Sequence, residues 1–129
     1  MADIYETIYK KLYRLIPHLD RIKTASKAKT SAFMDLNLDI LDDTKDYKII
    51  ALSHYYKHPS GDMIPDPDMT IRIYKATKTA EALTYQDLYR YDQVYAEQGE
   101  LVNKKVKQQL NQFLDSWLSN LLDQGHKFP

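Results

Sequence analysis

Apolar positions follow a helical period at both ends of the chain. Ile4, Ile8, Leu12 and Leu15 recur every three or four residues, which predicts an N-terminal helix that Asp3 caps and that ends near residue 16. The widest apolar face lies near the C-terminus and predicts a long helix over residues 103–123. Its apolar residues are Val106, Leu110, Phe113, Leu114, Trp117, Leu118, Leu121 and Leu122. Both helices therefore need a surface that covers their apolar sides.

Between these helices the apolar residues alternate with polar ones, which is typical of half-buried strands. The alternation predicts strands over residues 31–40, 47–58, 69–74 and 79–85, and a short edge strand over residues 88–95. In the first of these, Asp35, Asn37 and Asp39 share an acidic outer face. Residues 17–30 are rich in lysine and arginine and are expected to form a basic connection or a weak extension of the first helix.

These elements predict a single α+β domain over residues 1–129. The expected order is an N-terminal helix, an antiparallel four- to five-stranded meander and a long C-terminal helix, with both helices on one face of the sheet. The 129 residues are 43% hydrophobic and 28% charged, which are ordinary values for a globular domain of this size. We therefore expect a core that needs no metal or disulfide to fold.

Charge and composition exclude several classes of function. The 18 basic residues balance the 18 acidic ones, so global attraction to nucleic acid is not expected. The absence of cysteine rules out disulfides, thiolate catalysis and cysteine metal sites. The N-terminus lacks a secretion signal, and no apolar run reaches the roughly 18 residues that span a bilayer. We expect a cytoplasmic protein without a membrane partner.

The densest turn chemistry lies between the second and third predicted strands. From this loop and the ends of the strands on either side of it we predict a binding site whose residues are His54, Tyr56, His58, Asp62, Asp66, Asp68 and Arg72. On one strand, histidines four residues apart lie about 13 Å apart, too far to share a metal ion. The aspartates are interpreted as turn-formers that bond their own backbone, so neither a metal site nor a cofactor is predicted.

A second candidate site lies at the start of the C-terminal helix. Lys104, Lys105 and Lys107 occupy its first turn, where the helix dipole disfavours positive charge. Lysines beside the free N–H groups of a helix start form a candidate anion-binding site. The alternative is that Glu97 and Glu100 neutralise these lysines at the surface.

No motif requires catalysis. Ser53 or Ser60 could be drawn as a nucleophile with His54 or His58 as its base, but the chain has no nucleophile elbow. It also lacks a Walker loop, a dinucleotide fingerprint and a zinc-protease motif. The sequence favours a non-enzymatic protein and leaves the question of catalysis open.

Several runs together resemble a known family. They include P-x-M-T-x-R-x-Y over residues 67–74 and N-Q-F-L-x-x-W-L over residues 111–118, followed by Gly125 and His126. In this order the chain, from about residue 47 to residue 126, is similar to the YqiB-like family, a bacterial family of unknown function. The run G-D-x-x-x-D-P-x-M over residues 61–69 is also similar to small uncharacterised proteins of mobile elements. The resemblance implies a bacterial α+β domain without an assigned activity.

Three hypotheses about function follow. The first is a protein-binding or accessory module, encoded on a mobile element and interfering with a host system, which would use its eleven tyrosines and its central loop. The second is a small metal-dependent hydrolase that uses the loop of residues 54–68. The third is a weak nucleic-acid binder that uses basic patches, which the zero net charge disfavours. The tyrosine-rich edge strand leaves homodimerisation open.

Overall fold

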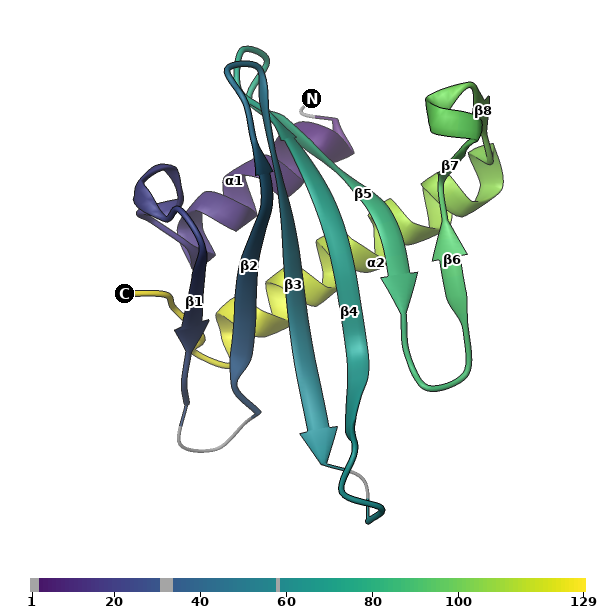
Figure 1. The fold of residues 1–129 in the computed structure, drawn as a ribbon. Coiled ribbons are helices and arrows are strands. Elements are labelled where there is room, and N and C mark those ends of the chain that lie inside the picture. The colour runs from purple at the N-terminus through teal and green to yellow at the C-terminus, as the bar shows by residue number, and fades with distance from the viewer. Residues whose placement is uncertain (1–2, 31–33, 58) are drawn as a thin grey trace.

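The computed structural model describes residues 3–30, 34–57 and 59–129, without the side chains of Tyr56, Lys57 and Pro65. Helix α1 (Ile4–Leu15) precedes a sheet of six strands, and helix α2 (Lys104–Asp123) follows it (Figure 1). Both helices lie on the same face of this sheet (Figure 1). The expected α+β architecture is confirmed.

The six strands form a simple meander in which every neighbouring pair is antiparallel. In sheet order they are β1 (Ala25–Ala28), β2 (Leu36–Asp43), β3 (Tyr47–Lys57), β4 (Met63–Tyr74), β5 (Thr79–Gln86) and β6 (Tyr91–Gln93). A separate hairpin pairs β7 (Tyr95–Ala96) with β8 (Leu101–Val102). Two short 3-10 helices, η1 (Leu19–Arg21) and η2 (Glu97–Gly99), complete the described elements.

Both long helices begin at the caps that the sequence predicts, and α2 ends just before the predicted glycine. The Asp3 carboxylate accepts a hydrogen bond from the Glu6 N–H at 2.9 Å, and the Asn103 amide oxygen accepts one from the Val106 N–H at 3.1 Å. These caps satisfy backbone donors that a helix start leaves free. Gly125 has a φ of +86°, the left-handed geometry that ends a helix at lowest cost with glycine.

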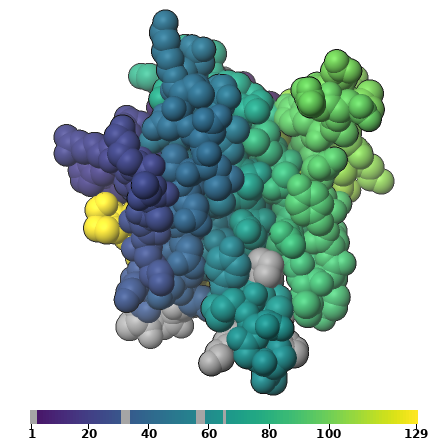
Figure 2. Space-filling view, in the orientation of Figure 1, coloured from purple at the N-terminus to yellow at the C-terminus, as the bar shows by residue number. Residues whose placement is uncertain are grey.

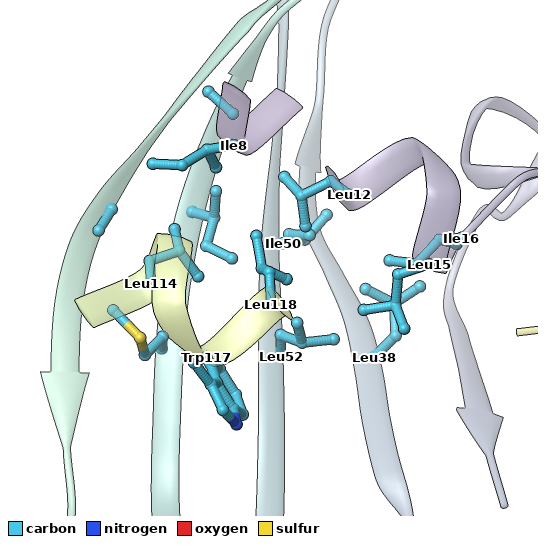
Figure 3. Close-up of a cluster of buried hydrophobic side chains, with 14 of the residues drawn as sticks. Ile8, Leu12, Leu15, Ile16, Leu38, Ile50, Leu52, Leu114, Trp117 and Leu118 are labelled. Carbon is cyan, nitrogen blue, oxygen red and sulfur yellow. The ribbon is translucent and has the colours of Figure 1, made fainter. Parts of the chain in front are cut away.

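The core lies between the sheet and the two helices (Figure 3). Its fully buried members include Ile8 and Leu12 of α1, Ile50 and Leu52 of β3, and Leu118 of α2. The two predicted apolar stripes therefore pack against the sheet, except that Phe113 of the second stripe is 39% exposed. Burial of this surface is the main favourable term in folding.

The N-terminal half of the sheet is one strand larger than the sequence indicates. Residues 17–30, expected to be a connection or a helix extension, contain η1 and the edge strand β1. Only Ala28 of the four β1 residues is buried, so this strand has no apolar alternation to reveal it. At the other edge, the strand predicted over residues 88–95 is shorter and divides between β6 and β7.

The central loop is also shorter than expected, because β4 begins at Met63. Pro65 and Pro67 therefore lie within a strand. The register of β3 and β4 shifts here, from Ser53 opposite Asp68 to Tyr55 opposite Pro65. Such a bulge accommodates prolines, which lack the N–H that a regular ladder requires.

The C-terminal segment packs against the end of α1 and the residues before β2. Phe128 is 2% exposed, and its N–H donates to the Leu15 carbonyl at 3.0 Å. His126 is equally buried and contacts the Met34 carbonyl through Nε2 at 2.9 Å. Within the described residues, no helix has the length and apolar character needed to cross a membrane.

Candidate functional site

The residues predicted to form one site in the central loop lie in different places. His54 is 7% exposed and points to the helix-covered face of the sheet. Asp68 and Arg72 lie on the opposite face, where Asp68 contacts Tyr55. Asp62 lies in the exposed turn and contacts Ser60 at 3.2 Å.

Asp66 is exposed within β4, whereas His58 and the Tyr56 side chain lie outside the described residues. Among the described residues, no group of three or more histidine, aspartate or glutamate side chains is placed to hold a metal ion. The described members of this prediction therefore do not converge.

His54 serves to pack the sheet against α2. Its ring meets the Trp117 ring edge-on at a centroid distance of 5.8 Å and lies 5.5 Å from the His126 ring. Burial, and then the neighbouring His126, lower the pKa of His54, while Asp66 opposes them. The side chain is therefore neutral at pH 7. Because Ser53 points to the opposite face, His54 is not placed as its base.

The face of the sheet that α1 and α2 do not cover is called the open face below. It fills the front of the molecule in Figure 2. Register places five polar residues in one row across this face, each directly opposite the next. They are Lys27, Asn37, Ser53, Asp68 and Gln86. Each alternates with residues that point into the core. The acidic outer face predicted for Asp35, Asn37 and Asp39 belongs to the open face, where Asp39 is exposed and the other two are partly buried.

A groove with a volume of about 760 Å³ lies on the open face beside the edge strand β1. We call it the Asp39 groove. Its polar lining includes Lys27, Asp35, Asn37 and Asp39, and its apolar lining includes Met34 and Met63. Tyr55 forms part of its wall.

The centre of the polar row adjoins this groove through Tyr55, whose hydroxyl donates to Asp68 Oδ2 at 3.3 Å. The other carboxylate oxygen of Asp68 and the Ser53 hydroxyl oxygen are buried, with no hydrogen-bond partner among the described residues. Burial, and to a smaller extent the charge of Asp39, raise the pKa of Asp68, while the Tyr55 hydrogen bond opposes them. A positive charge placed here would stabilise the ionised carboxylate.

A second groove, of about 510 Å³, lies on the open face next to the β7–β8 hairpin. We call it the Arg72 groove. Arg72, Tyr74 and Tyr95 line it, together with Thr84, Gln93 and Gln98. The Arg72 guanidinium lies over the Tyr47 ring, 5.2 Å from its centroid.

The lysines predicted to bind an anion differ in their exposure and contacts. Lys104 and Lys105 are exposed. Lys107 is partly buried, donates to the Tyr95 hydroxyl at 3.1 Å and lies over the Tyr5 and Tyr95 rings. The Tyr95 hydrogen bond raises the pKa of Lys107, and the charge of Glu81 adds to this effect. This lysine connects α2 to β7 and to α1.

Sequence reasoning identified the acidic outer face of β2 but missed both grooves. Each groove depends on pairing between strands, and the period-two pattern does not specify which polar residues of different strands face each other. The lysine-rich composition of residues 17–30 gave no indication that β1 borders a groove.

Comparison of the sequence with known proteins places this chain in a family. The model of the family described as "Domain of unknown function (DUF6908)" matches residues 4–127. The chain is 28% identical to "Uncharacterized protein YqiB" of Escherichia coli strain K12, over 97% of this chain and 88% of the relative. The YqiB proteins of Escherichia coli O6:H1 and O157:H7 match to the same extent. The similarity thus begins well before residue 47, where the sequence motifs start. No solved structure matches the chain.

Proposed function

We propose that this chain, which belongs to the DUF6908 family, is a non-enzymatic module that binds a basic segment of a protein partner in the Asp39 groove. The observation that supports this function is the combination of an open groove with carboxylates that lack a matching number of cations. Asp35 and Asp39 line the groove, and Asp68 adjoins it through Tyr55. Lys27 is the one cation among the described lining residues.

The apolar part of the groove suits a polypeptide. Met34 and Met63 come from different parts of the chain and both line the groove, where they are 41% and 59% exposed. Exposed methionines adapt to the shape of a partner and are common on protein-binding surfaces. Apolar walls beside carboxylates fit a lysine or arginine side chain, whose stem is apolar and whose end is charged.

The same charges favour a protein partner over nucleic acid. Two lining carboxylates and the adjacent Asp68 outnumber Lys27, so a phosphate backbone would be repelled. An arginine or lysine side chain would instead gain charge-assisted hydrogen bonds, which are roughly twice as strong as neutral ones.

Fluorescence polarisation with three labelled peptides tests this function. The peptides have the same length and differ only at the central residue, which is arginine, glutamine or glutamate. We expect the arginine peptide to bind best, the glutamate peptide to bind least, and the affinity for arginine to fall as salt rises. Asp39→Asn should weaken arginine binding about three- to fivefold, the size expected for one partly exposed ion pair.

Asp46→Asn is the matched control. Asp46 is an exposed carboxylate in the turn between β2 and β3 and does not line the groove, so its removal should leave affinity unchanged. Equal binding of all three peptides, or the same affinity for the wild type and Asp39→Asn, would contradict the proposed function.

A further inference from the structure

The Arg72 groove contains a positive charge that forms no direct ion pair with a carboxylate of the described residues. Arg72 lies directly opposite Glu81 in the β4–β5 register, a position in which arginine and glutamate commonly form an ion pair. Among the described residues, however, no ion pair joins Arg72 to a carboxylate. Its Nε atom is buried and has no hydrogen-bond partner among them.

Both oxygens of Glu81 accept hydrogen bonds from tyrosine hydroxyls rather than from Arg72. The Tyr74 hydroxyl donates to Oε2 at 3.1 Å, and the Tyr95 hydroxyl donates to Oε1. Behind Tyr95, the Lys107 ammonium donates to the same hydroxyl at 3.1 Å. The carboxylate is 7% exposed, so these partners replace most of its contact with water.

The network therefore contains two cations and one carboxylate. The Tyr74 side chain, and more weakly the charge of Glu81, raise the pKa of Arg72, and Glu81 also acts on Lys107 through Tyr95. One carboxylate is therefore shared by two cations, which leaves one positive charge in excess. Asp42, a further carboxylate near this region, is exposed and accepts from the Tyr47 hydroxyl at 3.1 Å, at the far end of the ring over which Arg72 lies. One net positive charge thus faces the groove.

We propose that the Arg72 groove binds the carboxylate group of a ligand, with the Arg72 guanidinium as its anchor. The planar guanidinium fork matches a planar carboxylate, and a single anionic charge completes the balance of the network. Thr84, Gln93 and Gln98 line the groove and supply polar groups around the ligand, while Tyr74 and Tyr95 supply ring surface. This site is separate from the Asp39 groove and does not depend on the function proposed for it.

The backbone beside the groove has a conformation that is unusual for residues other than glycine. Glu97 and Gln98 both have left-handed φ values, of 53° and 56°, before Gly99. Outside glycine this conformation costs roughly 1 kcal/mol per residue, and such residues concentrate at functional sites. The turn formed by these residues brings Gln98 to the groove.

Titration of the ¹⁵N-labelled protein with sodium acetate, at constant ionic strength set with sodium chloride, tests the proposal. Because Arg72 Nε is buried, its N–H proton should exchange slowly and give an observable resonance. We expect this resonance and the amides of Gln93 and Gln98 to shift saturably, with half-saturation on the order of millimolar, as is usual for a ligand this small. Arg72→Lys should weaken binding about tenfold or more, because lysine cannot form the bidentate contact.

Arg90→Lys is the matched control. The Arg90 guanidinium also lies over a tyrosine ring, that of Tyr85 at 5.0 Å, but its Nε is paired with Asp92 at 3.1 Å. Its substitution should leave acetate binding unchanged. Thermal unfolding of each variant checks the fold, and the wild-type Arg72 resonance gives a result even if Arg72→Lys unfolds.

A second pair of probes identifies the source of the carboxylate. An N-acetylated dipeptide with a free C-terminal carboxylate is compared with its amide. Tighter binding of the free acid than of acetate supports recognition of a peptide terminus, and equal binding supports a small organic acid. No saturable shift of the Arg72 resonance with acetate, or tighter binding of inorganic phosphate than of acetate, would overturn the proposal. The Asp39→Asn variant should bind acetate normally, so failure here is distinguishable from failure of the peptide experiment.

Discussion

Asn111 joins α2 to the bulge of β5, and replacing it with alanine tests how the two layers are held in register. The side chain is 1% exposed. Its amide oxygen accepts from the Ala82 N–H at 2.8 Å, and its amide nitrogen donates to the Lys107 carbonyl at 2.8 Å. The register shift between Thr70 and Ile71 leaves the Ala82 N–H in need of a partner outside the strand ladder.

Asn111→Ala leaves that N–H buried without an acceptor, which costs about 1–3 kcal/mol. The Lys107 carbonyl loses less, because the helix backbone also provides it with a donor. Alanine in place of asparagine raises helix propensity by about 0.5 kcal/mol. Asn120→Ala, at an exposed position of the same helix, gives the same gain without the loss. We therefore expect Asn111→Ala to be about 2 kcal/mol less stable than Asn120→Ala.

Urea and thermal unfolding followed by circular dichroism measure this difference. For a chain of this length, about 2 kcal/mol corresponds to a midpoint roughly 6–10 °C lower. Hydrogen exchange adds a local measurement, because the Ala82 amide should lose protection beyond the global change in stability. Equal unfolding free energies of the two variants, within about 0.5 kcal/mol, would refute the reasoning that this contact holds the bulge.

Two further predictions concern the core and pH. Leu118→Ala, at a position with 0% exposure, should lower the free energy of unfolding by about 2–5 kcal/mol, whereas Leu101→Ala, at 58% exposure, should change it by about 0.5 kcal/mol or less. If chemical denaturation gave similar losses of unfolding free energy for Leu118→Ala and Leu101→Ala, the assigned core would be wrong. Burial and His126 lower the folded-state pKa of His54, so the unfolded chain takes up a proton first as pH falls below about 6.5. Stability should therefore decrease from about pH 7 to pH 5, and this decrease should be smaller in His54→Gln. An identical pH dependence in the wild type and in His54→Gln would exclude His54 as the cause.

The sequence predicts the helices of this fold best, because their apolar faces and caps are local signals. Asp3, Asn103 and Gly125 mark helix ends that the structure reproduces. The central strands were also predictable, because Ile50 and Leu52 alternate with residues of the other face. The edge strand β1 was not, because an edge strand with one buried residue lacks this alternation.

The grooves could be predicted only in part. The alternation in β2 placed Asn37 and Asp39 on an outer face, but their neighbours across the sheet depend on register. Arg72 was recognised as a candidate binding residue. The contact of Tyr95 with the Glu81 carboxylate could not be predicted, because it depends on the β7–β8 hairpin, a feature without a period in the sequence.

The most direct test of the proposed function is to map where the arginine peptide binds. In a ¹⁵N titration we predict saturable shifts of the amides that surround the Asp39 groove, among them Asn37, Asp39, Tyr55 and Met63. The glutamate peptide should cause no shift of these amide signals. Shifts centred on α1 and α2, or no saturable shift with the arginine peptide, would contradict the assignment of the open face as the binding surface.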